Sequence, residues 1–223
     1  MVKKDRIPLI AIKDLTWWYP QQTKPLFKKL NFDLFPGDFT VIIGKSGVGK
    51  STLVKFLIGE LRPYSKTVYY RMDDLSTLSD EEIQRYRRKV GIVFQDDKLI
   101  QTLSIKENIT YPLRLAGESE SSINSKYKAI VEKLQLEDQG KINSKHISGG
   151  EKQKVAVARA MIHNPEFIIA DEPTGNLDRG YTQEIGNLLI EANKWGNSII
   201  LITHDIHLLN HIKAKANVNI FQM

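Results

Sequence analysis

The 223-residue sequence predicts an α/β fold with three parts: a parallel-sheet core, an antiparallel β subdomain and an inserted helical subdomain. Strands that alternate with helices predict the parallel sheet and its right-handed crossovers. Alternating apolar residues near the N-terminus predict the antiparallel strands, and helical periodicity over about residues 96–164 predicts the insertion. We expect a single domain over residues 1–223, because this length supports one sizeable core rather than two.

The N-terminal third contains several predicted strands. Apolar residues alternate over 9–19 and 26–35, which predicts antiparallel strands, and a Pro-Gly-Asp turn then leads into an apolar strand at 39–43. A helix is expected from Lys50 to about residue 59, followed by a short strand at 68–71 and a charged helix at 80–88. The turn at 62–66 has no glycine, so its type stays open.

The remaining two thirds alternate between strands and helices. Residues 90–94 predict a buried strand that delivers Gln95 to the carboxyl edge of the sheet. Helices are expected at 105–115 and 123–134, within the insertion. Strand character returns at 167–170 and 199–202, with a helix between them, and residues 218–221 predict a short edge strand.

The apolar strand at 39–43 is followed by the pattern G-x-x-x-x-G-K-S, at the start of a predicted helix. Glycines allow successive backbone N–H groups to face one point, and the helix start adds the positive end of its dipole. The residues of this phosphate-binding loop are Gly44, Lys45, Ser46, Gly47, Val48, Gly49, Lys50 and Ser51. Lys50 can reach the β and γ phosphates of a nucleotide, and the Ser51 hydroxyl can ligate Mg²⁺.

A second group of polar residues follows the apolar strand at 167–170. Asp171 and Glu172 stand where one carboxylate can ligate Mg²⁺ and the next can polarise an attacking water molecule. Paired acids after a strand are also common as helix caps, but the upstream phosphate-binding loop favours the catalytic interpretation.

Ser148, Gly149, Gly150 and Glu151 begin another predicted helix. Serine and the glutamate three residues later fit a capping box, which leaves the two glycines unexplained. Because adjacent glycines weaken a first helical turn, we interpret them as a close approach of backbone N–H groups to an anion, and so as a second phosphate-binding terminus.

Two aromatic side chains keep alternative interpretations. His204 follows a strand of the sheet and can bind a γ phosphate, or it is an ordinary loop residue. Tyr19 can stack on adenine or pack on the edge of the sheet.

Composition narrows the class of protein without deciding it. The 32 Lys and Arg exceed the 26 Asp and Glu by a formal charge of +6, which is a mild bias towards anionic partners. The absence of cysteine excludes disulfides and thiolate metal sites. A signal peptide is not expected, and no apolar run approaches the roughly 18 residues that span a bilayer.

In their order and spacing, these motifs resemble the ATP-binding subunits of ABC transporter-type ATPases, over essentially the whole chain. The resemblance assigns Gly44 to Thr52 to Walker A, Gln95 to the Q-loop, Ser148 to Glu151 to the signature, Asp171 to Walker B, Asp178 to the D-loop and Tyr19 to the adenine-stacking aromatic. It implies ATP and Mg²⁺ as cofactors, with Glu172, His204 and Gln95 as catalytic residues and Ser51, Gln95 and Asp171 as metal ligands.

The resemblance also implies partners and a place of action. We expect a homodimer that binds ATP between its subunits, no nucleic acid, and an integral membrane permease-like partner that holds the chain at the cytoplasmic face of the membrane. Residues 91–96, 148–153 and 171–178 are similar to a cell-division subfamily, while ATPases of lipoprotein-release and macrolide-export systems share most of them. ABC-type ATPases that act on the ribosome or DNA are a further alternative, but these usually carry two cassettes or a long coiled-coil insertion.

Overall fold

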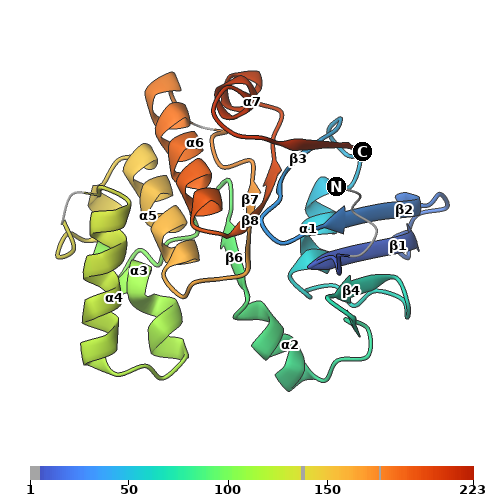
Figure 1. The fold of residues 1–223 in the computed structure, drawn as a ribbon, viewed down its shortest axis with the longest axis horizontal. Helices are drawn as coiled ribbons and strands as arrows, with labels where there is room; N and C mark the ends of the chain where they lie inside the picture. The colour runs from blue at the N-terminus through green and yellow to red at the C-terminus, as the bar shows by residue number, and fades with distance from the viewer. Residues whose placement is uncertain (1–5, 137–138, 176) are drawn as a thin grey trace.

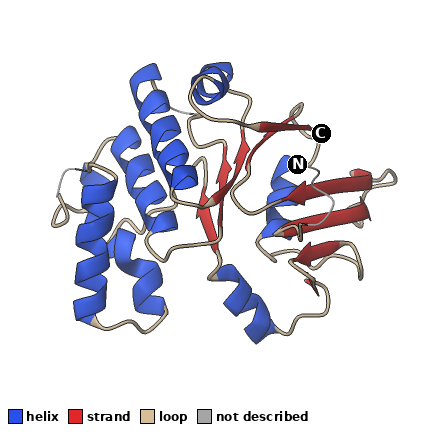
Figure 2. Ribbon diagram, in the orientation of Figure 1, coloured by secondary structure: helices blue, strands red, loops and turns tan. Residues whose placement is uncertain are grey.

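The computed structural model describes residues 6–136, 139–175 and 177–223, which form two sheets and surrounding helices (Figures 1 and 2). The parallel sheet has the order β6-β7-β8-β3-β9 and consists of β3 (Phe39–Ile43), β6 (Val90–Val93), β7 (Phe167–Asp171), β8 (Ser198–Ile202) and β9 (Asn219–Gln222). The antiparallel sheet has the order β2-β1-β4-β5 and consists of β1 (Ile10–Trp17), β2 (Phe27–Leu34), β4 (Val68–Tyr70) and β5 (Asp73–Asp74). The predicted fold class is confirmed.

The strands β3, β6, β7 and β8 of the parallel sheet are mostly buried on both faces, as their continuous apolar sequences require, whereas the edge strand β9 is largely exposed. Phe167 and Ile169 of β7 point into the core shared with α1 (Lys50–Leu57), which lies between the two sheets. Ile168 and Ala170 point to the opposite face, where α5 (Gly149–Met161) packs. The helices α1 and α5 therefore cover opposite faces of one sheet.

The other helices match the predicted pattern with shifted ends. They are α2 (Asp80–Arg87), α3 (Ile105–Leu115), α4 (Glu120–Lys133), α6 (Arg179–Lys194) and α7 (Ile206–Lys213). The helix expected at 123–134 begins earlier because Ser119 caps it, accepting a hydrogen bond from the backbone N–H of Ser122. Among the residues described, no helix is both long and apolar enough to cross a bilayer.

Two details of the antiparallel region differ from expectation. Strand β1 ends at Trp17, so Tyr19, which was expected at the end of the strand, lies in the following loop. In the turn at 62–66, Lys66 adopts the left-handed conformation, with φ 63°, where glycine would be the usual residue. Its backbone N–H donates to Asp74 Oδ2 at 2.6 Å, which helps to offset the cost of that conformation.

Strand β6 meets α5 at Gly91. A Cβ atom added to Gly91 would lie 2.4 Å from the carbonyl oxygen of Ala160, which is backbone and cannot rotate away. The absence of a side chain at residue 91 therefore allows α5 to approach the sheet.

We predict that Gly91→Ala lowers the free energy of unfolding by about 1–3 kcal/mol, because the added methyl group overpacks this contact. Urea titration followed by circular dichroism measures the change. Ser125→Ala, on the exposed face of α4, is the control and should stay within about 0.5 kcal/mol of the unchanged chain. A Gly91→Ala chain as stable as this control would contradict the close approach.

Candidate functional site: a glycine loop and the ends of the parallel strands

The glycine loop between β3 and α1 is held in a fixed shape. Gly49 caps α1 in the left-handed conformation, with φ 106°, and a Cβ atom there would lie 2.4 Å from the Phe27 ring. The Lys50 Nζ donates to the carbonyl oxygens of Gly44 at 2.9 Å and Lys45 at 3.1 Å. The loop's own carbonyls therefore hold the Lys50 ammonium beside the loop.

The first turn of α1 presents further polar groups. The Tyr19 hydroxyl lies 3.0 Å from Thr52 Oγ1, which holds the half-buried tyrosine beside the helix start. Ser51 is exposed. The predicted roles of Tyr19 in stacking and of Ser51 in metal binding remain predictions, in positions consistent with them.

Asp171, at the end of β7, shares its electrostatic environment with the glycine loop. Burial raises the pKa of the Asp171 carboxyl, the negative charge of Glu172 raises this pKa further, and the positive charge of Lys50 lowers it. Residues more than a hundred positions apart in the sequence therefore meet at the carboxyl edge of the sheet.

Glu172 turns sharply away from β7 towards the end of β8. Its φ of 49° is left-handed, which costs roughly 1–2 kcal/mol in a residue other than glycine. The Glu172 carboxylate accepts a hydrogen bond from the backbone N–H of His204 at 3.2 Å, and His204 Nδ1 lies 2.8 Å from Glu172 Oε1. The glutamate side chain is 14% exposed and that of the histidine 74%, so a largely buried carboxylate orients an exposed imidazole.

The acidic pair does not cap the next helix. Asp178 caps α6, and its carboxylate accepts from the backbone N–H of Tyr181 at 3.0 Å. Helix capping, the alternative interpretation of Asp171 and Glu172, therefore does not apply to α6. The neighbouring Asn176 of the D-loop motif lies outside the described residues.

Gln95 follows β6 and lies against the turn after β7. A Cβ atom added to Gly175 would lie 2.8 Å from Gln95 Nε2, so the two segments are in contact. The segment that follows Gln95 is bound to α5: Arg159 donates to the carbonyl oxygens of Asp97 at 2.7 Å and Lys98 at 2.9 Å.

Gln153 of α5 donates to the carbonyl oxygen of Phe94 at 2.8 Å, which ties the helix to the end of β6 as well. Gln153 and Arg159 had no predicted role. The sequence carries little signal for them, because Gln153 stands among the charged residues Glu151, Lys152 and Lys154 and Arg159 is a single cation in the apolar second half of the helix.

At the start of α5, the structure shows a packing contact that the sequence did not reveal. Ser148 and Glu151 form the predicted capping box, with the backbone N–H of Ser148 donating to Glu151 Oε2 at 2.8 Å. Gly150, however, is needed for packing, because a Cβ atom there would lie 2.2 Å from the Tyr181 ring. At Gly149, among the described residues, one atom of Leu177 lies 4.0 Å from such a Cβ. Packing against Tyr181 is therefore a reason for Gly150 that does not depend on an anion, and anion binding at this helix start stays a prediction.

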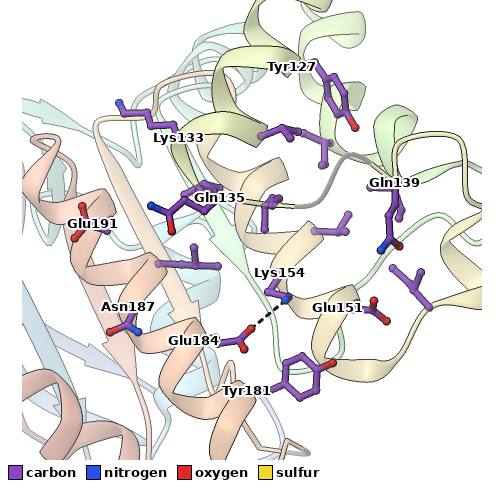
Figure 3. Close-up of a pocket in the computed structure, with 18 residues that line it drawn as sticks. Tyr127, Lys133, Gln135, Gln139, Glu151, Lys154, Tyr181, Glu184, Asn187 and Glu191 are labelled. Atoms are coloured by element: carbon purple, nitrogen blue, oxygen red, sulfur yellow. Dashed lines mark hydrogen bonds and ion pairs between the residues drawn. The ribbon is translucent and has the colours of Figure 1, made fainter.

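The predicted residues form two separate clusters. Lys50, Asp171, Glu172 and His204 are linked in one cluster, while Ser148 and Asp178 meet through Tyr181 in the other. A cavity of about 710 Å³ lies away from the glycine loop, between α3, α4, α5 and α6 (Figure 3). Of the predicted site residues, only Glu151 lines it. This cavity is therefore not the phosphate-binding site.

Comparisons with known proteins agree with this geometry. The model of the ABC transporter family matches residues 27–175. The cell division ATP-binding protein FtsE of Bacillus subtilis is 35% identical over 207 residues, which covers 93% of this chain and 90% of that protein. FtsE of Escherichia coli K12 is 36% identical over 181 residues, which covers 81% of this chain and 82% of that protein.

Solved structures show the same likeness. One solved structure is the ATP-binding cassette MJ0796, a dimer in a post-hydrolysis state bound to ADP and Pi. It is 31% identical with a TM-score of 0.80, and the match covers 91% of this chain and 90% of the MJ0796 chain. CbiO1 of Clostridium perfringens, part of the ABC transporter complex cbiONQ, is 28% identical with a TM-score of 0.86 and covers 98% of this chain and 85% of its own. The chain therefore belongs to the ABC transporter family, as an ATP-binding subunit with ATPase activity that is similar to FtsE.

Proposed function

We propose that two copies of this chain bind two molecules of MgATP between them and pass the resulting motion to an FtsX-like membrane partner in cell division. In each site, Lys50 and the glycine loop come from one subunit, and Ser148 and the start of α5 come from the other. The name of the FtsE relatives supports the cell-division role. The proposed place of action is the cytoplasmic face of the membrane, where the chain is peripheral.

One observation carries the shared site. The helix that starts at Lys50 and the helix that starts after Ser148 lie on opposite faces of the parallel sheet. Both starts can bind an anion through backbone N–H groups and the helix dipole. With the sheet between them, they cannot meet on one γ phosphate within a single chain, but a two-fold, head-to-tail dimer brings them together twice.

The residues at the strand ends suit Mg²⁺. The Ser51 hydroxyl, the Asp171 carboxylate and the Gln95 amide offer oxygen atoms, which this cation prefers, and Mg²⁺ sites on nucleotides need only one or two carboxylates. Repulsion between Glu172 and Asp171, which raises the pKa of Asp171, favours a cation at this position. Held by Ser51, Asp171 and Gln95, Mg²⁺ would supply positive charge that neutralises the negative charge developing on the phosphates.

Glu172 and His204 have different roles in ATP hydrolysis. The Glu172 carboxylate polarises and orients the attacking water, while its bond to His204 keeps the exposed imidazole directed at the γ phosphate. The strained backbone of Glu172 fits a residue whose position matters more than its local stability.

Coupling to the membrane partner runs through Gln95 and residues 96–104. Gln95 contacts Gly175 at the edge of the sheet where we place the nucleotide, and Arg159 of α5 donates a hydrogen bond to the carbonyl oxygen of Asp97. The segment therefore links the ends of the parallel strands to α5. Its exposed side chains, including Asp96 and Lys98, form the surface on which a helix of the partner docks.

We predict that Glu172→Gln binds MgATP but hydrolyses it between about 10² and 10⁴ times more slowly, because the water loses its polarising group. The trapped chain should accumulate as a dimer. Phosphate release measures turnover, and Glu132→Gln, an exposed change on α4, is the control that keeps normal turnover. Near-normal turnover in Glu172→Gln would remove this residue from the mechanism.

The shared site predicts complementation between two inactive chains. Lys50→Ala or Ser148→Arg alone disables both sites of a homodimer. In a mixture, about half of the dimers contain one chain of each kind and one intact site, so up to about a quarter of the normal activity returns. ATP-dependent dimerisation of the mixture is measured in parallel, in case the two sites are strictly coupled. No rise in either signal over the separate chains would refute the shared site.

A charge swap tests the coupling surface. Asp96 and Lys98 form an exposed ion pair at 3.3 Å, and the double change Asp96→Lys with Lys98→Glu reverses both charges at constant net charge. We expect loss of co-purification with the co-expressed FtsX-like partner and unchanged ATP binding. The matched control, Glu191→Lys with Lys194→Glu, reverses an exposed ion pair on α6 and should leave co-purification intact. Equal recovery of the partner with both swaps would exclude this surface.

A further inference from the structure

Tyr181, in the first turn of α6, is in contact with the first two turns of α5. Its hydroxyl lies 3.3 Å from Ser148 Oγ, and its ring occupies the space that a side chain at residue 150 would need. The Lys154 Nζ lies 5.4 Å from the centre of the same ring and pairs with Glu184 of α6 at 3.0 Å (Figure 3). Two residues of α5 and its N-cap, Ser148, therefore contact one side chain of α6.

The backbone of Tyr181 is also fixed. Its N–H donates to Asp178 Oδ1, which is the cap of α6. Tyr181 thus joins the start of α6, where Asp178 lies, to the start of α5, where Ser148 lies. Next to this contact, residues of the same two helices line the cavity of about 710 Å³.

We infer that Tyr181 is a positioning residue that locks the start of α5 onto the start of α6 and so fixes the N–H groups around Ser148 for the partner's nucleotide. This inference rests on the proposed shared site. It gives Gly150 a role that the nucleotide alone does not: the glycine admits the tyrosine ring. The requirement for glycine at residue 150 should therefore depend on what stands at residue 181.

A double-mutant cycle tests this dependence. Gly150→Ala, Tyr181→Ala and the double variant are made in the Glu172→Gln chain, and dimerisation with MgATP is measured by sedimentation. Overpacking of about 1–3 kcal/mol corresponds to a loss of about 5-fold to 150-fold for Gly150→Ala when Tyr181 is present. With alanine at residue 181 the same change should cost less than about twofold, because the clash is gone.

Single-chain measurements separate positioning from folding. Tyr181→Ala should weaken dimerisation by about tenfold while MgATP binding by the single chain stays within about twofold, because the glycine loop lies on the other face of the sheet. Tyr181→Phe keeps the ring and should recover most of the dimerisation. Equal losses of MgATP binding and dimerisation would show a general folding defect and overturn the inference, and so would normal dimerisation of Tyr181→Ala.

Thermal melting without nucleotide distinguishes this inference from the proposed function. Gly150→Ala should lower the melting midpoint only when Tyr181 is present, whereas Gly149→Ala should have the same effect with either residue at 181. Equal effects of Gly150→Ala in both backgrounds would refute the contact. If the Glu172→Gln chain with native Gly150 and Tyr181 stays monomeric in MgATP, the shared site fails even though melting still supports the contact.

Discussion

The proposed site depends on one electrostatic constraint: a polyphosphate needs many hydrogen-bond donors directed at one point, and we propose that the chain divides these donors between two helix starts. The start of α1 carries the glycine loop and Lys50, and the start of α5 carries Ser148. The parallel sheet lies between the two helices. Because each start supplies only part of the shell of donors, the fold itself favours a second chain as the source of the other part.

Close contacts of three glycines, with two aromatic rings and one backbone carbonyl, hold the helix starts and the sheet in place. The ring of Phe27 packs against Gly49 at the start of α1, the carbonyl of Ala160 against Gly91, and the ring of Tyr181 against Gly150. The strands β3, β7 and β8, buried on both faces, carry the chemistry to a common edge. The segment after Gln95 then joins that edge to α5 through the hydrogen bonds that Arg159 donates to Asp97 and Lys98.

The sequence predicts those features that depend on neighbours along the chain. The loop at Gly44 to Ser51, the acids after β7 and the capping box at Ser148 are local patterns, so their positions were readable. The packing role of Gly150 was not readable, because Tyr181, whose ring it contacts, is far away in the sequence and carries no motif. The left-handed Lys66 and the clamp of Arg159 on residues 97–98 likewise depend on tertiary contacts, which spacing does not reveal.

The most direct test of the divided site is a distance between chains. The sequence contains no cysteine, so single cysteines at the exposed Lys24, two residues before Leu26, which packs against Gly49 at the start of α1, and at the exposed Lys145, just before Ser148, can carry spin labels selectively. Chains that carry one label each are mixed in the Glu172→Gln background, and electron–electron distances are measured with and without MgATP. The account predicts that MgATP creates a distance between unlike positions that is shorter than either distance between like positions. Chains that stay apart in MgATP, or like positions that lie closer, would contradict it.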